Sequence, residues 1–180
     1  MTEEKKEKWL SWLALTTVVF AVGATLATFK GGSYSTRALL SQTQASDQWA
    51  FFQAKSIKGN LYALQKEQLE LQLGVLGPAA PADVRAVYEG RIAASSQRIQ
   101  KYEQEQAQIK AAAESLEMNR DACKRHQSAF GIAVIYLQVT ILLSSVSALM
   151  KKRPLWYAAM VLGVLGLIQF ANGFLLFFGN

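Results

Sequence analysis

The sequence has few of the residues that build disulfides, metal sites or catalytic centres. Cys123 is the only cysteine and His126 the only histidine, so neither a disulfide within the chain nor a paired Cys or His metal site is expected. No glycine-rich phosphate loop follows a strand pattern, and no nucleophile motif occurs. We therefore predict that the protein is not an enzyme and has no catalytic residue, cofactor or metal.

Charge is absent from three long stretches of the chain. Residues 9–29, 129–150 and 155–178 contain no Asp, Glu, Lys, Arg or His. We call them the apolar segments. Each exceeds the roughly 20 residues with which a helix crosses about 30 Å of hydrocarbon. They predict three transmembrane helices, because three buried helices of a soluble protein would need more polar chain around them than residues 30–128 provide.

Basic residues gather at one side of the predicted spans. Three lysines precede the first span, and residues 151–154 (KKRP) connect the second span to the third. Short loops rich in Lys and Arg stay in the cytoplasm, and two crossings bring both sites to the same side. We expect residues 1–8 and 151–154 to be cytoplasmic and residues 30–128 to be periplasmic or extracellular. The prediction is a multi-pass protein of the bacterial inner (plasma) membrane.

The stretch between the first two spans predicts two antiparallel helices. Gly31 and Gly32 are expected to end the first helix where it leaves the bilayer. Residues 74–82 (GVLGPAAPA) hold the one dense turn signal of the chain, and Asp83 then suits a helix N-terminus. No helix-breaking signal follows up to residue 150, so the second helix is expected to continue into the second span. The predicted fold is all-α, with three spans and a long hairpin resembling a coiled coil.

Two rows of residues step along this hairpin by four and three positions, the spacing of a coiled-coil seam. We predict that the rows face each other. The first row is Ala50, Ala54, Ile57, Leu61, Leu64, Gln68, Leu71 and Val75. The second row is Tyr88, Ile92, Ser95, Ile99, Tyr102, Gln106, Ile109, Ala113 and Leu116.

Polar residues within the rows make a single hairpin a weak coiled coil, which favours completion of its core by other copies. The leading hypothesis is a non-enzymatic structural or interaction protein, a scaffold that self-associates through its hairpin and spans. The alternative is an accessory subunit of a respiratory, photosynthetic or transport complex. A third hypothesis is an oligomeric channel or transporter. The lipid bilayer is an expected partner, whereas nucleic acid is not, because basic and acidic residues are mixed along the hairpin.

Two sets of residues are candidates for contacts. Three aromatics within four residues cannot all face one two-helix seam, so this part of the hairpin is predicted to form an interface. The interface candidates are Asp47, Trp49, Phe51, Phe52, Lys55 and Lys58. Small and weakly polar residues in the spans are expected to pack helices closely. These are Ala14, Thr17, Ala21, Ala24, Gln138, Gly163, Gly166, Gln169 and Asn172.

Three short stretches carry a family resemblance. They are residues 29–35 (FKGGSYS), 44–50 (QASDQWA) and 53–58 (QAKSIK). With these motifs the chain resembles a bacterial membrane-protein family catalogued only as a domain of unknown function. The resemblance extends over most of the chain, from the first span to the paired final spans. It implies no activity, substrate or cofactor.

Overall fold

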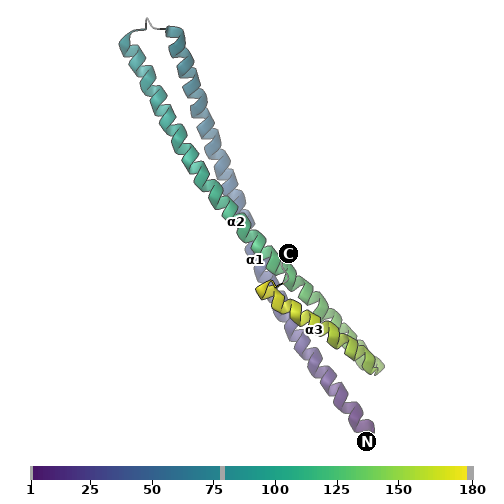
Figure 1. Ribbon diagram of the computed structural model, residues 1–180. Coiled ribbons are helices and arrows are strands. Elements are labelled where there is room, and N and C mark those ends of the chain that lie inside the picture. The colour runs from purple at the N-terminus through teal and green to yellow at the C-terminus, as the bar shows by residue number, and fades with distance from the viewer. Residues whose placement is uncertain (1, 78–79, 178–180) are drawn as a thin grey trace. The chain divides into compact units, whose positions relative to one another are not determined.

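The chain is all-α. The computed structural model describes residues 2–77 and 80–177, with side chains from residue 8 onward. These residues form three helices and no strand: α1 (Thr2–Leu76), α2 (Ala82–Met150) and α3 (Arg153–Leu175) (Figure 1). All three helices are long and apolar enough to cross a membrane. The prediction of an all-α chain with three such helices is confirmed.

The C-terminal end of α1 and both ends of α3 differ from the prediction by two or three residues, and a larger difference lies within α1. α1 passes through Gly31 and Gly32 without a break, so the predicted helix end there is wrong. One glycine inside a helix costs only about 1 kcal/mol, which a helix of 75 residues tolerates. Gly31 has a packing role instead, because a Cβ there would lie 3.3 Å from the Phe130 Cβ.

Residues within the two connections explain why one helix ends and the next begins there. Between α1 and α2, Gly77 has a φ of 65°, which glycine adopts without a steric penalty, and its carbonyl accepts a hydrogen bond of 3.1 Å from the Arg85 guanidinium. Between α2 and α3, Pro154 lies in the first turn of α3, where proline is favoured. Four positions of the predicted segments lie outside the described residues: Met1 of the N-terminal segment, Pro78 and Ala79 of the turn, and Phe178 of the third span.

The chain divides into two compact units, Met1–Leu40 with Asn119–Asn180 and Ser41–Met118. We call the first the three-helix unit and the second the two-helix unit.

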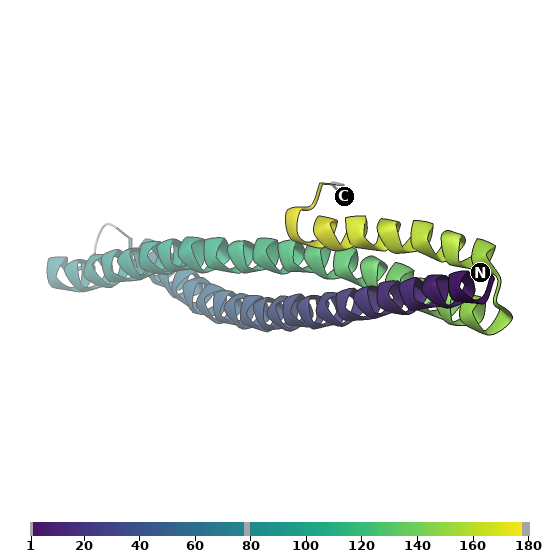
Figure 2. The same ribbon diagram turned by 90° about the horizontal axis from the view of Figure 1, so that it is seen from below.

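In the three-helix unit, α3 lies beside the adjoining parts of α1 and α2 (Figure 2). Two small clusters form its core, one around Phe20, Ala24 and Leu137 and the other around Ala27, Phe130 and Ala133. Small residues next to large ones allow the helices to approach closely.

The two-helix unit contains one part of α1 and one part of α2. Its contacts join Trp49 to Glu117, Lys55 to Glu105 and Tyr62 to Tyr102, so residue numbers rise along α1 as they fall along α2. All residues of the predicted second row are buried or partly buried.

The predicted first row is wrong, because it points away from α2. Its large members are 60–89% exposed: Ile57, Leu61, Leu64, Leu71 and Val75. A different row of α1, again spaced by four and three positions, is buried or partly buried. We call the predicted first row (residues 50–75) the outer row and the buried one the inner row. The inner row consists of Ser41, Ala45, Gln48, Phe52, Lys55, Gly59, Tyr62, Lys66, Leu69 and Leu73.

Candidate functional site

The predicted interface residues separate into two groups on α1. Trp49, Phe52 and Lys55 are partly buried within the two-helix unit. The Trp49 indole donates a hydrogen bond of 3.0 Å to Glu117 Oε1 and meets the Phe52 ring edge to face, with centroids 5.6 Å apart. These contacts lie within one chain.

Lys55 is the centre of a polar contact in the same unit. Its Nζ lies 2.7 Å from Glu105 Oε2 and 5.5 Å from the centroid of the Tyr102 ring. The hydrogen bond from Lys55, with further attraction from its charge and from Lys101 and Lys58, lowers the pKa of Glu105 below 4.5. Glu105 therefore stays ionised at neutral pH and holds the lysine between the helices.

The remaining three interface candidates, Asp47, Phe51 and Lys58, are exposed. Half of the Phe51 side chain is accessible, and its ring lies 5.2 Å from Lys55 Nζ. These residues are available to another molecule, although the large aliphatic residues of the outer row form a more extensive surface on the same helix.

The nine predicted packing residues differ in burial. Ala24 packs against Phe20 and Leu137, and Gly163 and Gly166 lie against Phe20 and Leu137, respectively. A Cβ on Gly163 would overlap the Phe20 ring, and one on Gly166 would lie 3.0 Å from the Leu137 Cγ. Ala24, Gly163, Gly166 and Asn172 are buried; Thr17, Ala21 and Gln169 are partly buried; Ala14 and Gln138 are exposed.

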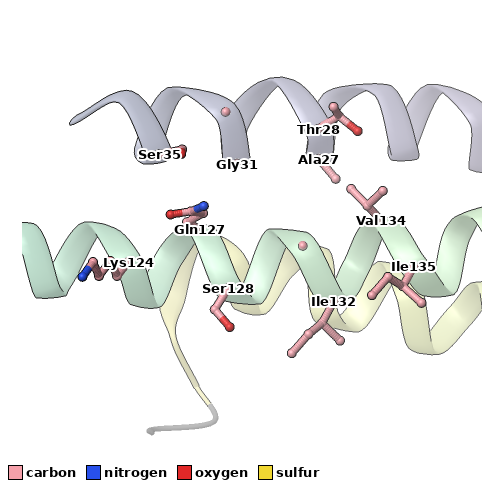
Figure 3. A pocket seen from close by; sticks show the side chains of 12 residues that line it. Ala27, Thr28, Gly31, Ser35, Lys124, Gln127, Ser128, Ile132, Val134 and Ile135 are labelled. Carbon is pink, nitrogen blue, oxygen red and sulfur yellow. The ribbon is translucent and has the colours of Figure 1, made fainter. Parts of the chain in front are cut away.

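A groove of about 760 Å³ lies in the three-helix unit, between α1 and α2. Its lining changes character along its length (Figure 3). Ser35, Lys124 and Gln127 lie toward one end, and Ala27, Val134 and Ile135 toward the other. Between them, Gly32 and Gly131 present no side chain, and a Cβ on either would meet nothing within 4 Å.

The polar end of the groove lies in a basic neighbourhood. Residues 30–40 and 119–128 include five basic residues and one acidic residue, Asp121. A hydrogen bond from Arg120 lowers the pKa of Asp121, and the charges of Lys124 and Arg125 lower it further. Positive potential therefore dominates this part of the unit.

A family model described as Domain of unknown function (DUF4337) matches residues 9–176. The chain belongs to this family. The resemblance stated from the sequence motifs is thus confirmed. No curated protein and no solved structure matches the chain.

Tyr34, in the first of the three stretches that carried the resemblance (residues 29–35), belongs to a cluster that the sequence did not predict. The Tyr34 ring stacks on the His126 ring at 4.6 Å and on the Phe130 ring at 5.9 Å. His126 Nδ1 lies 2.8 Å from the Gly173 carbonyl oxygen, and because a carbonyl only accepts, Nδ1 is the donor. The cluster joins α1, α2 and α3 of this DUF4337 member. In the sequence, only the stretch of residues 29–35 pointed to this region, because His126 and Gly173 are 47 residues apart.

Proposed function

We propose that this DUF4337 protein is a membrane-anchored scaffold without enzymatic activity. In this proposal the three apolar segments cross the bacterial inner membrane, the N-terminus is cytoplasmic, and the two-helix unit is an antiparallel hairpin on the outer side. Copies self-associate through the outer row of α1. A protein with this organisation would bring partners or further copies together at the outer side of the membrane.

Membrane insertion is supported by the large aliphatic side chains that the apolar segments expose. Val18, Val22 and Leu26 of α1 are 50–60% exposed, and Leu142 of α2 is 66% exposed. Exposed apolar surface of this extent is unfavourable in water and favourable among lipid chains. Trp9 and Trp156, whose ring centroids are 6.3 Å apart, suit the aromatic belt at the cytoplasmic face.

The observation that carries the self-association proposal is the outer row. Its five large aliphatic residues are exposed, yet they keep the heptad spacing that a helix needs to pair with another helix. Two copies would cover ten such side chains. Burial contributes about 25 cal/mol per Å² of apolar surface and roughly 1.5–3 kcal/mol for each such side chain. The ten side chains therefore correspond to roughly 600–1,200 Å² of buried surface. Stable interfaces start near 1,200 Å².

An interface at or below this size is too small to be stable on its own, and a shared membrane would compensate for the small area. Anchoring in one bilayer raises the effective concentration of the copies, so a modest interface suffices. A two-fold axis perpendicular to the membrane would place the α1 helices parallel, with each outer-row residue facing its own equivalent. Gln68 would then meet Gln68, and a polar residue within such a seam fixes its register.

Cysteine crosslinking in native membranes tests this arrangement. In a Cys123→Ser background, Leu64→Cys should form a disulfide between copies, because equivalent seam residues approach within the roughly 4.4–6.8 Å between Cα atoms that a disulfide allows. Ala63→Cys is the matched control, since Ala63 is exposed on α1 but lies outside the outer row. Gel electrophoresis without reductant measures the dimer fraction.

The expected result is a dimer band for Leu64→Cys that Ala63→Cys lacks. Equal crosslinking of the two variants, or crosslinking of neither, would contradict pairing through the outer row.

A second candidate function is that of an accessory subunit in a larger membrane complex. It is favoured by Phe51, whose ring is half exposed on the part of α1 that also carries the exposed residues Asp47 and Lys58. Aromatic residues are frequent anchors in protein interfaces. Mass spectrometry of the particle purified at native abundance distinguishes the two functions, because an accessory subunit brings a stoichiometric second protein with it.

A further inference from the structure

The groove between α1 and α2 has a lining that suits an amphipathic ligand. Its apolar residues Ala27, Val134 and Ile135 belong to the apolar segments, whereas Ser35, Lys124 and Gln127 lie outside them. The change from apolar to polar along the groove therefore coincides with the ends of the charge-free stretches at residues 29 and 129. The groove thus extends across the end of the first apolar segment and the start of the second.

We propose that this groove binds one anionic phospholipid. Its acyl chain lies along the apolar end, and its phosphate lies at the polar end near Lys124. The gap left by Gly32 and Gly131 accommodates the glycerol region, where no protein side chain intervenes.

Charge favours an anionic lipid over a zwitterionic one. Lys124 lines the groove itself, and the surrounding residues 30–40 and 119–128 carry five basic residues against one acidic residue. Each basic residue close to an anionic membrane surface strengthens binding by a factor of about five. Thr28, which also lines the groove, already donates its hydroxyl to the Ala24 carbonyl at 2.9 Å, so it places no unpaired donor beside the acyl chain.

This inference rests on the membrane insertion proposed above but not on self-association. Native mass spectrometry separates the two, because bound lipid and copy number appear as different masses in one spectrum. The full chain in mild detergent is mixed with equal amounts of phosphatidylglycerol and phosphatidylcholine of identical acyl chains. The retained lipid is then identified for each variant.

The wild type should retain phosphatidylglycerol in preference to phosphatidylcholine. Lys124→Gln should reduce that preference about fivefold. Gly131→Leu should reduce the retention of both lipids, because its side chain fills the groove. The matched controls are Lys110→Gln and Gly90→Leu: Lys110 is exposed in the two-helix unit, and a Cβ on Gly90 likewise meets nothing within 4 Å.

We expect Gly131→Leu to fold, since leucine favours a helix more than glycine does. The proposal is overturned if the wild type retains no phospholipid, or if each variant behaves like its control. A change of copy number in Gly131→Leu without loss of lipid would also overturn it, because a second copy would then occupy the groove.

Discussion

Glycines of α3 determine how closely that helix lies to its neighbours. Gly163 faces the Phe20 ring, and Gly173 faces the Phe130 ring, where a Cβ would lie 2.7 Å from Cδ1. Both phenylalanines are almost completely buried, so a ring displaced by a Cβ would have to move against other buried groups. The packing of this unit therefore depends on the absence of two methyl groups.

We expect Gly163→Ala to destabilise the three-helix unit. Overpacking typically costs about 1–3 kcal/mol, which exceeds the roughly 1 kcal/mol by which alanine favours a helix over glycine. Thermal unfolding in detergent, followed by circular dichroism, measures the change. Gly131→Ala is the control, because its new methyl group meets open space and should leave stability unchanged or higher. Equal melting temperatures for the two variants would show that Phe20 adapts.

The ion pair of Lys55 and Glu105 gives the two-helix unit a pH dependence. Since folding lowers the pKa of Glu105 below 4.5, its contribution to stability is complete above about pH 4.5 and is lost as the pH falls through the folded-state pKa. We expect the melting temperature to decrease slightly over that range, because the pair is partly accessible to solvent. Glu105→Gln and Lys55→Gln should both remove this component. A variant whose pH profile matches the wild type would contradict the assignment.

At the scale of elements, hydrophobic spacing correctly predicted that α1 has a seam but selected the wrong row for it. The outer row is the more apolar one, whereas the inner row includes Lys55, Gly59 and Lys66. Tyr62 stacks on Tyr102, and Glu105 neutralises Lys55, so paired polar and aromatic groups fill the space between the helices. The spacing criterion depends only on where the apolar residues lie and takes no account of contacts that neutralise a charge. On α2 the row with the coiled-coil spacing is also the row that is buried or partly buried, so the prediction is correct there.

The cluster around His126 was outside the reach of sequence reasoning for a different reason. Its hydrogen bond to Gly173 depends on where α3 ends relative to α2, and the Leu176 backbone, in a left-handed conformation, ends that helix by donating to the Asn172 carbonyl. A single sequence predicts each helix but not the axial position of one helix relative to its neighbour. The motif of residues 29–35 marked the region without revealing its contacts.

At the scale of the whole molecule, the absence of charge from long stretches was sufficient to predict three helices capable of crossing a membrane. The signal is strong because length and composition agree over more than 20 residues each. The predicted orientation depends on the basic residues at the ends of these stretches and is open to a direct test.

We expect residue 83 to face the outside and residue 152 the cytoplasm. In a Cys123→Ser background, Asp83→Cys should react with a membrane-impermeant maleimide in intact spheroplasts. Lys152→Cys should react only after permeabilisation, and since both side chains are exposed in the structure, accessibility is not limited by the protein. The opposite labelling pattern would reverse the orientation, and labelling of both sites in intact spheroplasts would contradict the single crossing predicted between residues 83 and 152.

The exposed outer row of α1 has a consequence for how such a protein would respond to its surroundings. If copies meet through this surface while diffusing in two dimensions, their pairing depends on the number of copies per unit area of membrane. Growth of the cell envelope at a constant copy number would dilute them and separate the pairs. Lateral crowding in a narrow patch of membrane would bring them together without any new synthesis.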